Sequence, residues 1–181
     1  MDNKKLIGSI VGVTAFIALI AGATLAWLNF SATVTNGSKS TGTMNFSVAY
    51  TQGTAVTNVP ILATPTAGTA ASLNVKANKV AGSVDGTLKI KLNTTTNQLA
   101  SDALNYAVCV GTCADGVKDN LTTSTIKGKI ANGTSTVDIY TGDLASSQTT
   151  YNIYFWLDPS KVEGGKQYAG YISATANQKE Q

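Results

Sequence analysis

The chain has 181 residues, with 13 Lys and Arg residues, 10 Asp and Glu residues and a formal net charge of +3. Its basic residues are all lysines and are scattered along the sequence, which argues against nucleic acid as a partner. Because the chain contains no histidine, Ser-His-Asp and Cys-His nucleophilic sites and histidine-ligated zinc are excluded. The low content of charged residues, 13%, and the abundance of Thr, Ser, Asn and Gly favour strands and turns.

The N-terminal segment is a single apolar run, Leu6 to Phe30, that contains no charged residue. Lys4 and Lys5 come directly before it. Such a segment predicts either a secretory signal peptide or a helix that spans a membrane, and a helix buried in a soluble core is a third alternative. The first two alternatives export the rest of the chain, so we expect an extracellular or cell-surface protein.

The two export alternatives differ in what happens at residue 26. Small residues before Ala26 suit a signal peptidase, which would remove residues 1–26 and leave Trp27 as the first mature residue. The apolar run is longer than a usual signal peptide, which favours an uncleaved anchor through residues 6–28. The protein is therefore expected to be anchored in the membrane only if the N-terminal apolar run is not cleaved.

The next segment, Trp27–Thr35, alternates apolar and polar residues and is predicted to be a strand. Its apolar face consists of Leu28, Phe30, Ala32 and Val34. A flexible joint follows, so residues 27–38 are a candidate assembly strand with its linker. The apolar face needs burial, which the strand can find in its own sheet or in a neighbouring subunit that lacks an edge strand.

Residues 39–181 are predicted to form a single β domain. Short alternating segments between turn residues predict about eight short strands, and the segment at 126–130 is a weak further candidate. After the first, they centre on residues 44–50, 73–76, 88–92, 104–110, 126–130, 137–139, 151–157 and 167–177. Residues 51–71 and 93–97 are predicted to be loops. The expected fold is all-β, a single antiparallel β-sandwich that is jelly-roll-like, after the N-terminal hydrophobic helix.

Aromatic residues concentrate in Tyr151–Leu157, the most apolar stretch outside the leader, which predicts a central strand. If exposed, Trp156, Tyr154 and Tyr171 would form a stacking platform for carbohydrate. We favour the alternative that these rings pack in the core.

The only two cysteines, Cys109 and Cys113, flank a turn that contains Gly111. In an exported chain they are expected to form a structural disulfide, because a redox pair would be one residue closer in sequence. Segment Asp115–Asn120 has some acidic residues but lacks the terminal Glu of a calcium loop, so it is interpreted as an exposed turn. The sequence predicts no catalytic, metal-binding or cofactor-binding site.

Both ends of the chain resemble the TasA/camelysin family of exported bacterial biofilm-matrix fibre proteins. The residues that carry this resemblance are the Lys4–Lys5 pair, the apolar run, and the segments 22–27, 40–48 and 170–178. The resemblance implies a jelly-roll surface or matrix protein able to polymerise. Two departures are the cysteine pair and Trp27-Leu28, where an Ala-Phe pair is usual; without histidine, the metalloprotease activity described for some members is not carried over.

The expected function is that of a non-enzymatic exported surface or extracellular-matrix protein, a fibre subunit that self-associates by donor-strand exchange. Two alternatives stay open. One is a membrane-anchored or pilin-like filament subunit that retains its N-terminal helix, although the glutamate of type IV pilins is missing. The other is a carbohydrate-binding or adhesive module.

Overall fold

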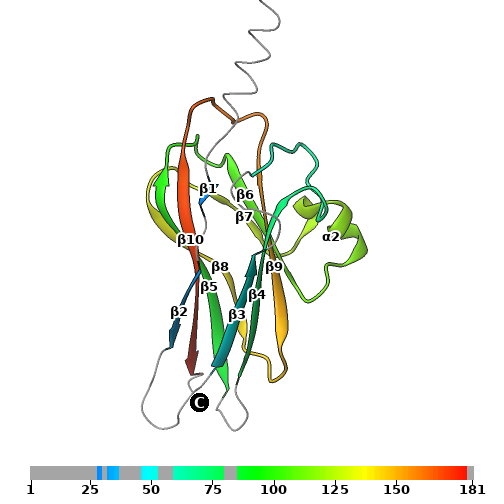
Figure 1. Ribbon diagram of the computed structural model, residues 1–181. Coiled ribbons are helices and arrows are strands. Elements are labelled where there is room, and N and C mark those ends of the chain that lie inside the picture. Colours follow the sequence, from blue (N-terminus) through cyan, green and yellow to red (C-terminus); the bar gives the residue numbers. More distant parts are fainter. Residues whose placement is uncertain (1–27, 30–31, 37–45, 53–58, 80–84, 179–181) are drawn as a thin grey trace, which may run out of the picture.

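A computed structural model of the chain describes residues 28–29, 32–36, 46–52, 59–79 and 85–178. These residues form ten strands, one short α-helix and one 3₁₀ turn (Figure 1). In chain order the elements are β1 (Leu28–Asn29), β2 (Ala32–Asn36), β3 (Phe46–Gln52), β4 (Ala71–Lys79), β5 (Gly86–Asn97), β6 (Leu104–Val110), α2 (Asp115–Asp119), η1 (Leu121–Thr123), β7 (Lys127–Ile130), β8 (Ser135–Asp143), β9 (Thr149–Leu157) and β10 (Tyr168–Gln178).

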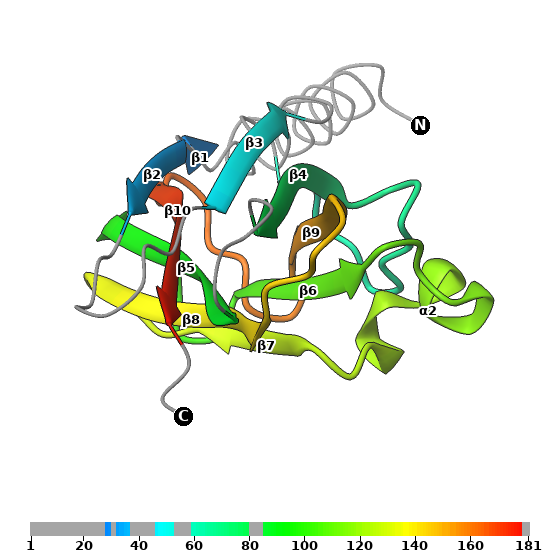
Figure 2. The ribbon, with the colours of Figure 1, turned by 90° about the horizontal axis from the view of Figure 1, so that it is seen from below.

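The strands form two five-stranded sheets that lie face to face as two layers (Figure 2). The first sheet has the order β1-β10-β5-β8, with β2 also paired to β10, and the second has the order β3-β4-β9-β6-β7. From β4 onward, every connection except β6 to β7 passes from one sheet to the other, as in a jelly roll. The predicted all-β sandwich is confirmed.

The core lies between the two sheets. Strand β5 shows why the sequence folds in this way: Leu88, Ile90 and Leu92 are completely buried, whereas Lys89 and Lys91 between them face outward. The facing sheet supplies Ile153 and Phe155, which are also completely buried. Alternation in the sequence therefore marks the inner face of both layers.

Strand β9 lies in the middle of its sheet, paired with β4 on one side and β6 on the other. Its inward residues join the main core, but Trp156 points the other way and packs with Ala107 and Leu121 in a second, smaller cluster. The prediction of a central strand with apolar residues on both faces is confirmed.

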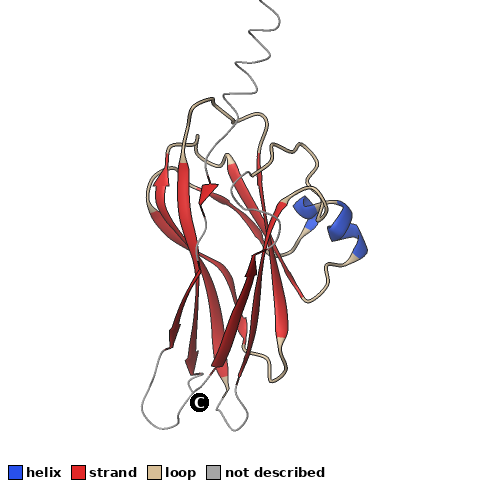
Figure 3. Cartoon of the chain, viewed as in Figure 1, coloured by secondary structure: helices blue, strands red, loops and turns tan. Residues whose placement is uncertain are grey.

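The second cluster exists because a cover lies over the outer face of this sheet. We define the cover as residues 60–70 together with residues 115–123. Its two parts are joined by backbone hydrogen bonds, from Ala67 N to Lys118 O (2.8 Å) and from Leu121 N to Pro65 O (2.9 Å). Figure 3 shows the helical part of the cover on this side of the sandwich and none on the other.

The structure corrects three sequence-based predictions. Residues 93–97, predicted to be a loop, continue β5, because Asn97 still pairs with Tyr168 of β10. Residues 115–119, predicted to be an exposed turn, have no buried residue, as expected, but they form the short helix α2. The N-terminal strands β1 and β2 run parallel to β10, whereas the other ladders are antiparallel.

Candidate functional site

The N-terminal strands lie at an edge of the first sheet, where, among the residues that the structure describes, they form a ladder with β10 alone (Figure 1). The register places Leu28 beside Tyr168, Ala32 beside Ile172 and Val34 beside Ala174. Ile172 and Ala174 are completely buried, so this edge of β10 borders the main core. Phe30, the fourth residue of the predicted apolar face, lies outside the described residues, as do the predicted cleavage residues Ala26 and Trp27.

Tyr168 anchors the beginning of the same edge. Its side chain is 1% exposed, and its hydroxyl shares a hydrogen bond of 2.9 Å with the hydroxyl of Thr94 on β5. Burial raises the pKa of Tyr168 to about 12, and the hydrogen bond to Thr94 opposes that shift. Strand β10 is thereby fixed to β5 at the same residue that pairs with Leu28 of β1.

The predicted disulfide is present, with Cys109 at the end of β6 and Cys113 just beyond it. Gly111 makes the turn between them at a φ of +70°, a conformation that favours glycine. Two further bonds hold this turn against β9: Gly111 N donates to Thr150 O (2.7 Å), and Asn152 Nδ2 donates to Gly111 O (2.6 Å). The disulfide therefore fixes the point where the chain leaves the sheet for the cover.

The three aromatic residues considered for carbohydrate stacking do not share a surface. Trp156 and Tyr154 lie under the cover on β9, whereas Tyr171 lies on the outer face of β10 in the other sheet. Trp156 is only 6% exposed, so its packing in a core is confirmed and its flat face is not a stacking surface.

Two cavities border the cover. The first, about 660 Å³, lies beside the disulfide and is lined by Cys113, Lys118, Asn152 and Tyr154 among others. The second, about 550 Å³, lies at the β6–β7–β9 side and is lined by Asn105, Lys127, Lys129, Trp156 and Asp158 among others. Volumes of this size suit small ligands.

Sequence reasoning missed the second cavity. In the sequence, Lys127 and Lys129 are two of the scattered lysines, and nothing around Asn105 marks it as a binding residue. The alternation of β6, β7 and β9 gave the outward direction of each residue, but only the register of the three strands brings these residues together.

The described residues contain no group of three or more His, Cys, Asp and Glu side chains that could hold a metal ion. Within the same part of the chain, no helix is long and apolar enough to cross a membrane. Comparison of the chain with protein-family models, with curated proteins and with solved structures finds no match.

Proposed function

We propose that this protein is a non-enzymatic structural subunit of an extracellular or cell-surface fibre, which assembles by exchange of its N-terminal strands between copies. The observation that carries the proposal is the position of β2. It lies at a sheet edge, its ladder with β10 consists of five residue pairs, and it is parallel where the ladders of the core are antiparallel.

Exchange would replace β2 by the same strand of a second copy. The backbone groups of β10 between Ile172 and Ala176 would then keep their hydrogen-bonding partners, and the buried side chains at that edge would stay covered. In the single chain the strand folds back onto its own β10. Exchange can begin from this self-paired form, because β2 of each copy already matches the edge of β10.

Export of the subunit is supported by the sequence and by the disulfide. The leader carries a charged start, an apolar middle and small residues before Ala26. A disulfide between Cys109 and Cys113 suits an oxidising compartment outside the cytoplasm. N-terminal sequencing of the mature protein would detect Trp27 if the leader is cleaved, whereas Met1 would favour the pilin-like alternative.

Deletion of residues 27–35 tests the exchange. We expect a folded, soluble monomer that no longer forms fibres by electron microscopy and that stops growth of fibres of the intact protein. A synthetic peptide of residues 27–36 should bind this monomer, and a peptide of the same composition in scrambled order serves as the control.

Two results would contradict the proposal. If the deleted protein unfolds and the peptide does not restore it, the strand belongs to its own sandwich. If the deleted protein still forms fibres, assembly uses another surface.

A further inference from the structure

A row of outward-facing residues crosses three neighbouring strands at the second cavity. Asn105 of β6 lies directly opposite Trp156 of β9 on one side and directly opposite Lys129 of β7 on the other. Residues opposite one another in antiparallel strands project from the same face of a sheet. All three line the cavity of about 550 Å³.

Two members of this row are largely buried side chains, each with one unpaired polar atom that is open to the cavity. Trp156 is 6% exposed and Asn105 is 7% exposed. Within the described residues, the indole N–H of Trp156 makes no hydrogen bond, and Asn105 uses its Nδ2 to donate to Ala103 O (3.1 Å) but accepts nothing at Oδ1. An unpaired donor and an unpaired acceptor therefore lie side by side on the lining of one cavity, where a single ligand can bond to both.

The third member supplies positive charge. Lys129 forms no ion pair within 4.0 Å in the described part of the chain, although its charge helps to lower the pKa of Asp158. Lys127 donates to the backbone oxygen of Thr122. The one acidic lining residue, Asp158, accepts hydrogen bonds from Ser160 N (2.9 Å) and Ser160 Oγ (2.7 Å), which hold the pKa of its carboxyl below the usual value. Two lysines against one aspartate leave the lining with a net charge of +1.

Apolar groups complete the cavity. Leu62 and Pro159 are part of its lining, and Tyr106 packs so closely against Gly128 that a Cβ there would meet the tyrosine hydroxyl at 2.6 Å. A ligand for this lining needs a hydroxyl-rich body with C–H faces, both a donor and an acceptor, and a negative group. A sugar ring that carries a carboxylate meets all of these requirements.

We propose that this cavity binds an acidic saccharide, with a uronate carboxylate at Lys129 and sugar hydroxyls at Trp156 and Asn105. This function goes beyond assembly. The cavity lies at the β7 end of its sheet, whereas the N-terminal strands lie near β3 at the other end, so binding and assembly can be tested separately.

Calorimetry with the intact mature protein tests the proposal, with trigalacturonate as the probe and the neutral galactose trisaccharide as its counterpart. We expect trigalacturonate to bind and the neutral sugar to bind at least about tenfold more weakly, since the charge-assisted contact is lost. Lys129→Gln should weaken trigalacturonate binding about tenfold for the same reason. Trp156→Phe, which keeps an aromatic ring but removes the N–H, should weaken it several-fold in a protein whose circular dichroism is unchanged.

Lys118→Gln is the matched control, because it removes one exposed lysine from the first cavity on the same face. It should change the affinity by less than about twofold. If Lys129→Gln and Lys118→Gln weaken trigalacturonate binding equally, the loss comes from the net charge of the protein and not from a contact at Lys129. That result would overturn the proposal. The proposal is also overturned if trigalacturonate does not bind or if the neutral sugar binds equally well. Equally tight binding of triglutamate would overturn it too, because the site would then suit acidic polypeptide.

Discussion

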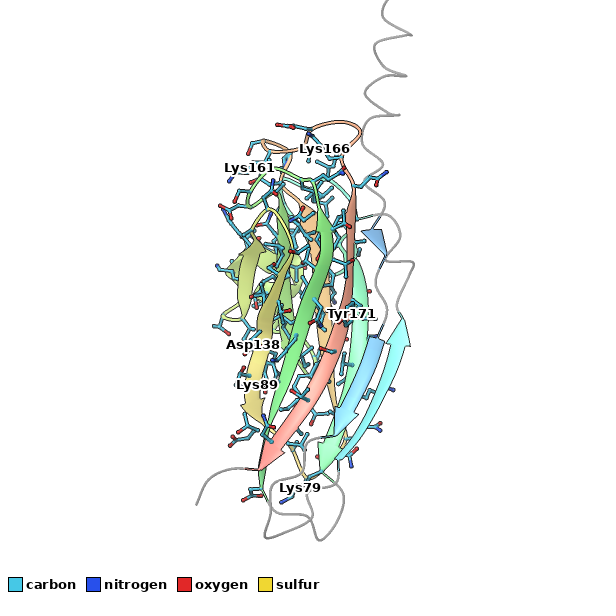
Figure 4. The ribbon with its side chains drawn as sticks, turned by 90° about the vertical axis from the view of Figure 1, so that its left-hand side faces the viewer. Lys79, Lys89, Asp138, Lys161, Lys166 and Tyr171 are labelled. Carbon is cyan, nitrogen blue, oxygen red and sulfur yellow. A yellow bond between two sulfur atoms is a disulfide. The ribbon has the colours of Figure 1, made fainter. Side chains whose placement is uncertain are left out.

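The outer faces of the two sheets differ in what lies on them. On the second sheet, Trp156 and Ala107 are buried under the cover, with Leu121 inserted above them. On the first sheet, the described residues place no loop or helix across β10, β5 and β8, and Lys89, Asp138 and Tyr171 lie on its open surface (Figure 4). The same sandwich therefore has one face that is part of a second core and one that meets solvent.

The residues that point outward account for this difference. On the open face, polar side chains satisfy one another across strands: Asn93 Nδ2 donates to Ser173 Oγ (2.8 Å), and Thr136 Oγ1 donates to Asn93 Oδ1 (3.2 Å). On the covered face, an exposed Trp156 would leave a large apolar surface in water, which the cover removes. Alternation in a strand thus predicts the main core, and a strand with apolar residues on both faces predicts an additional layer.

The largest effect on stability is expected from removal of the indole ring under the cover. Trp156→Ala is expected to lower the free energy of unfolding by about 3–5 kcal/mol, since it leaves a cavity between β9 and η1. Tyr171→Ala, on the open face, is the matched control and should cost less than about 1 kcal/mol. Urea unfolding measures both values, and equal losses would mean that the cover does not act as a second core.

Loss of the disulfide tests how the cover is attached. Changing Cys109 and Cys113 together to Ser should lower the free energy of unfolding by about 2 kcal/mol or less, because the bond closes a short loop. The sandwich should remain folded in circular dichroism, and the intact protein under reducing conditions should show the same loss. Complete unfolding would show that the cover cannot dock without this bond.

The smallest effect is expected on the open face. Asp138 lies 3.9 Å from the Lys89 ammonium and 3.8 Å from that of Lys91, and the three side chains are 34 to 42% exposed to solvent. Asp138→Asn should therefore change the free energy of unfolding by less than about 0.5 kcal/mol. Repeating the urea titration in about 1 M salt, where such pairs are screened, should remove even this difference. A larger loss would mean that the open face contributes to stability as the covered face does.

The main sandwich could be predicted from the sequence, since the signals for it are local. Alternation identified β5 from Leu88 to Leu92, and the aromatic stretch identified β9 as central. The C-terminal part of β5 was not predicted as strand, because Asn93–Asn97 is polar and resembles a loop. Its strand conformation depends on pairing with β10, which lies more than 70 residues further along the chain.

The candidate sites were less predictable, because they depend on register. The sequence predicted an N-terminal strand from its alternation, but nothing local to Ala32 and Val34 indicates that they run parallel to β10. Likewise, Asn105 and Lys129 look ordinary until the register places them in one row with Trp156. The cysteine pair was the exception, since its short spacing and glycine turn are local features.

The parallel direction of β2 and β10 has a mechanical consequence. The N-terminal strands begin beside Tyr168 and end beside Ala176, so the start of β1 and the end of β10 lie at opposite ends of the sandwich (Figure 1). A tensile force between these two points acts along the strands, and the hydrogen bonds of the ladder share it and break together. An antiparallel N-terminal strand would place both points at one end, where the same force would open the ladder one bond at a time. The chain is thus connected so that stretching along its long axis meets the greatest resistance this ladder can give.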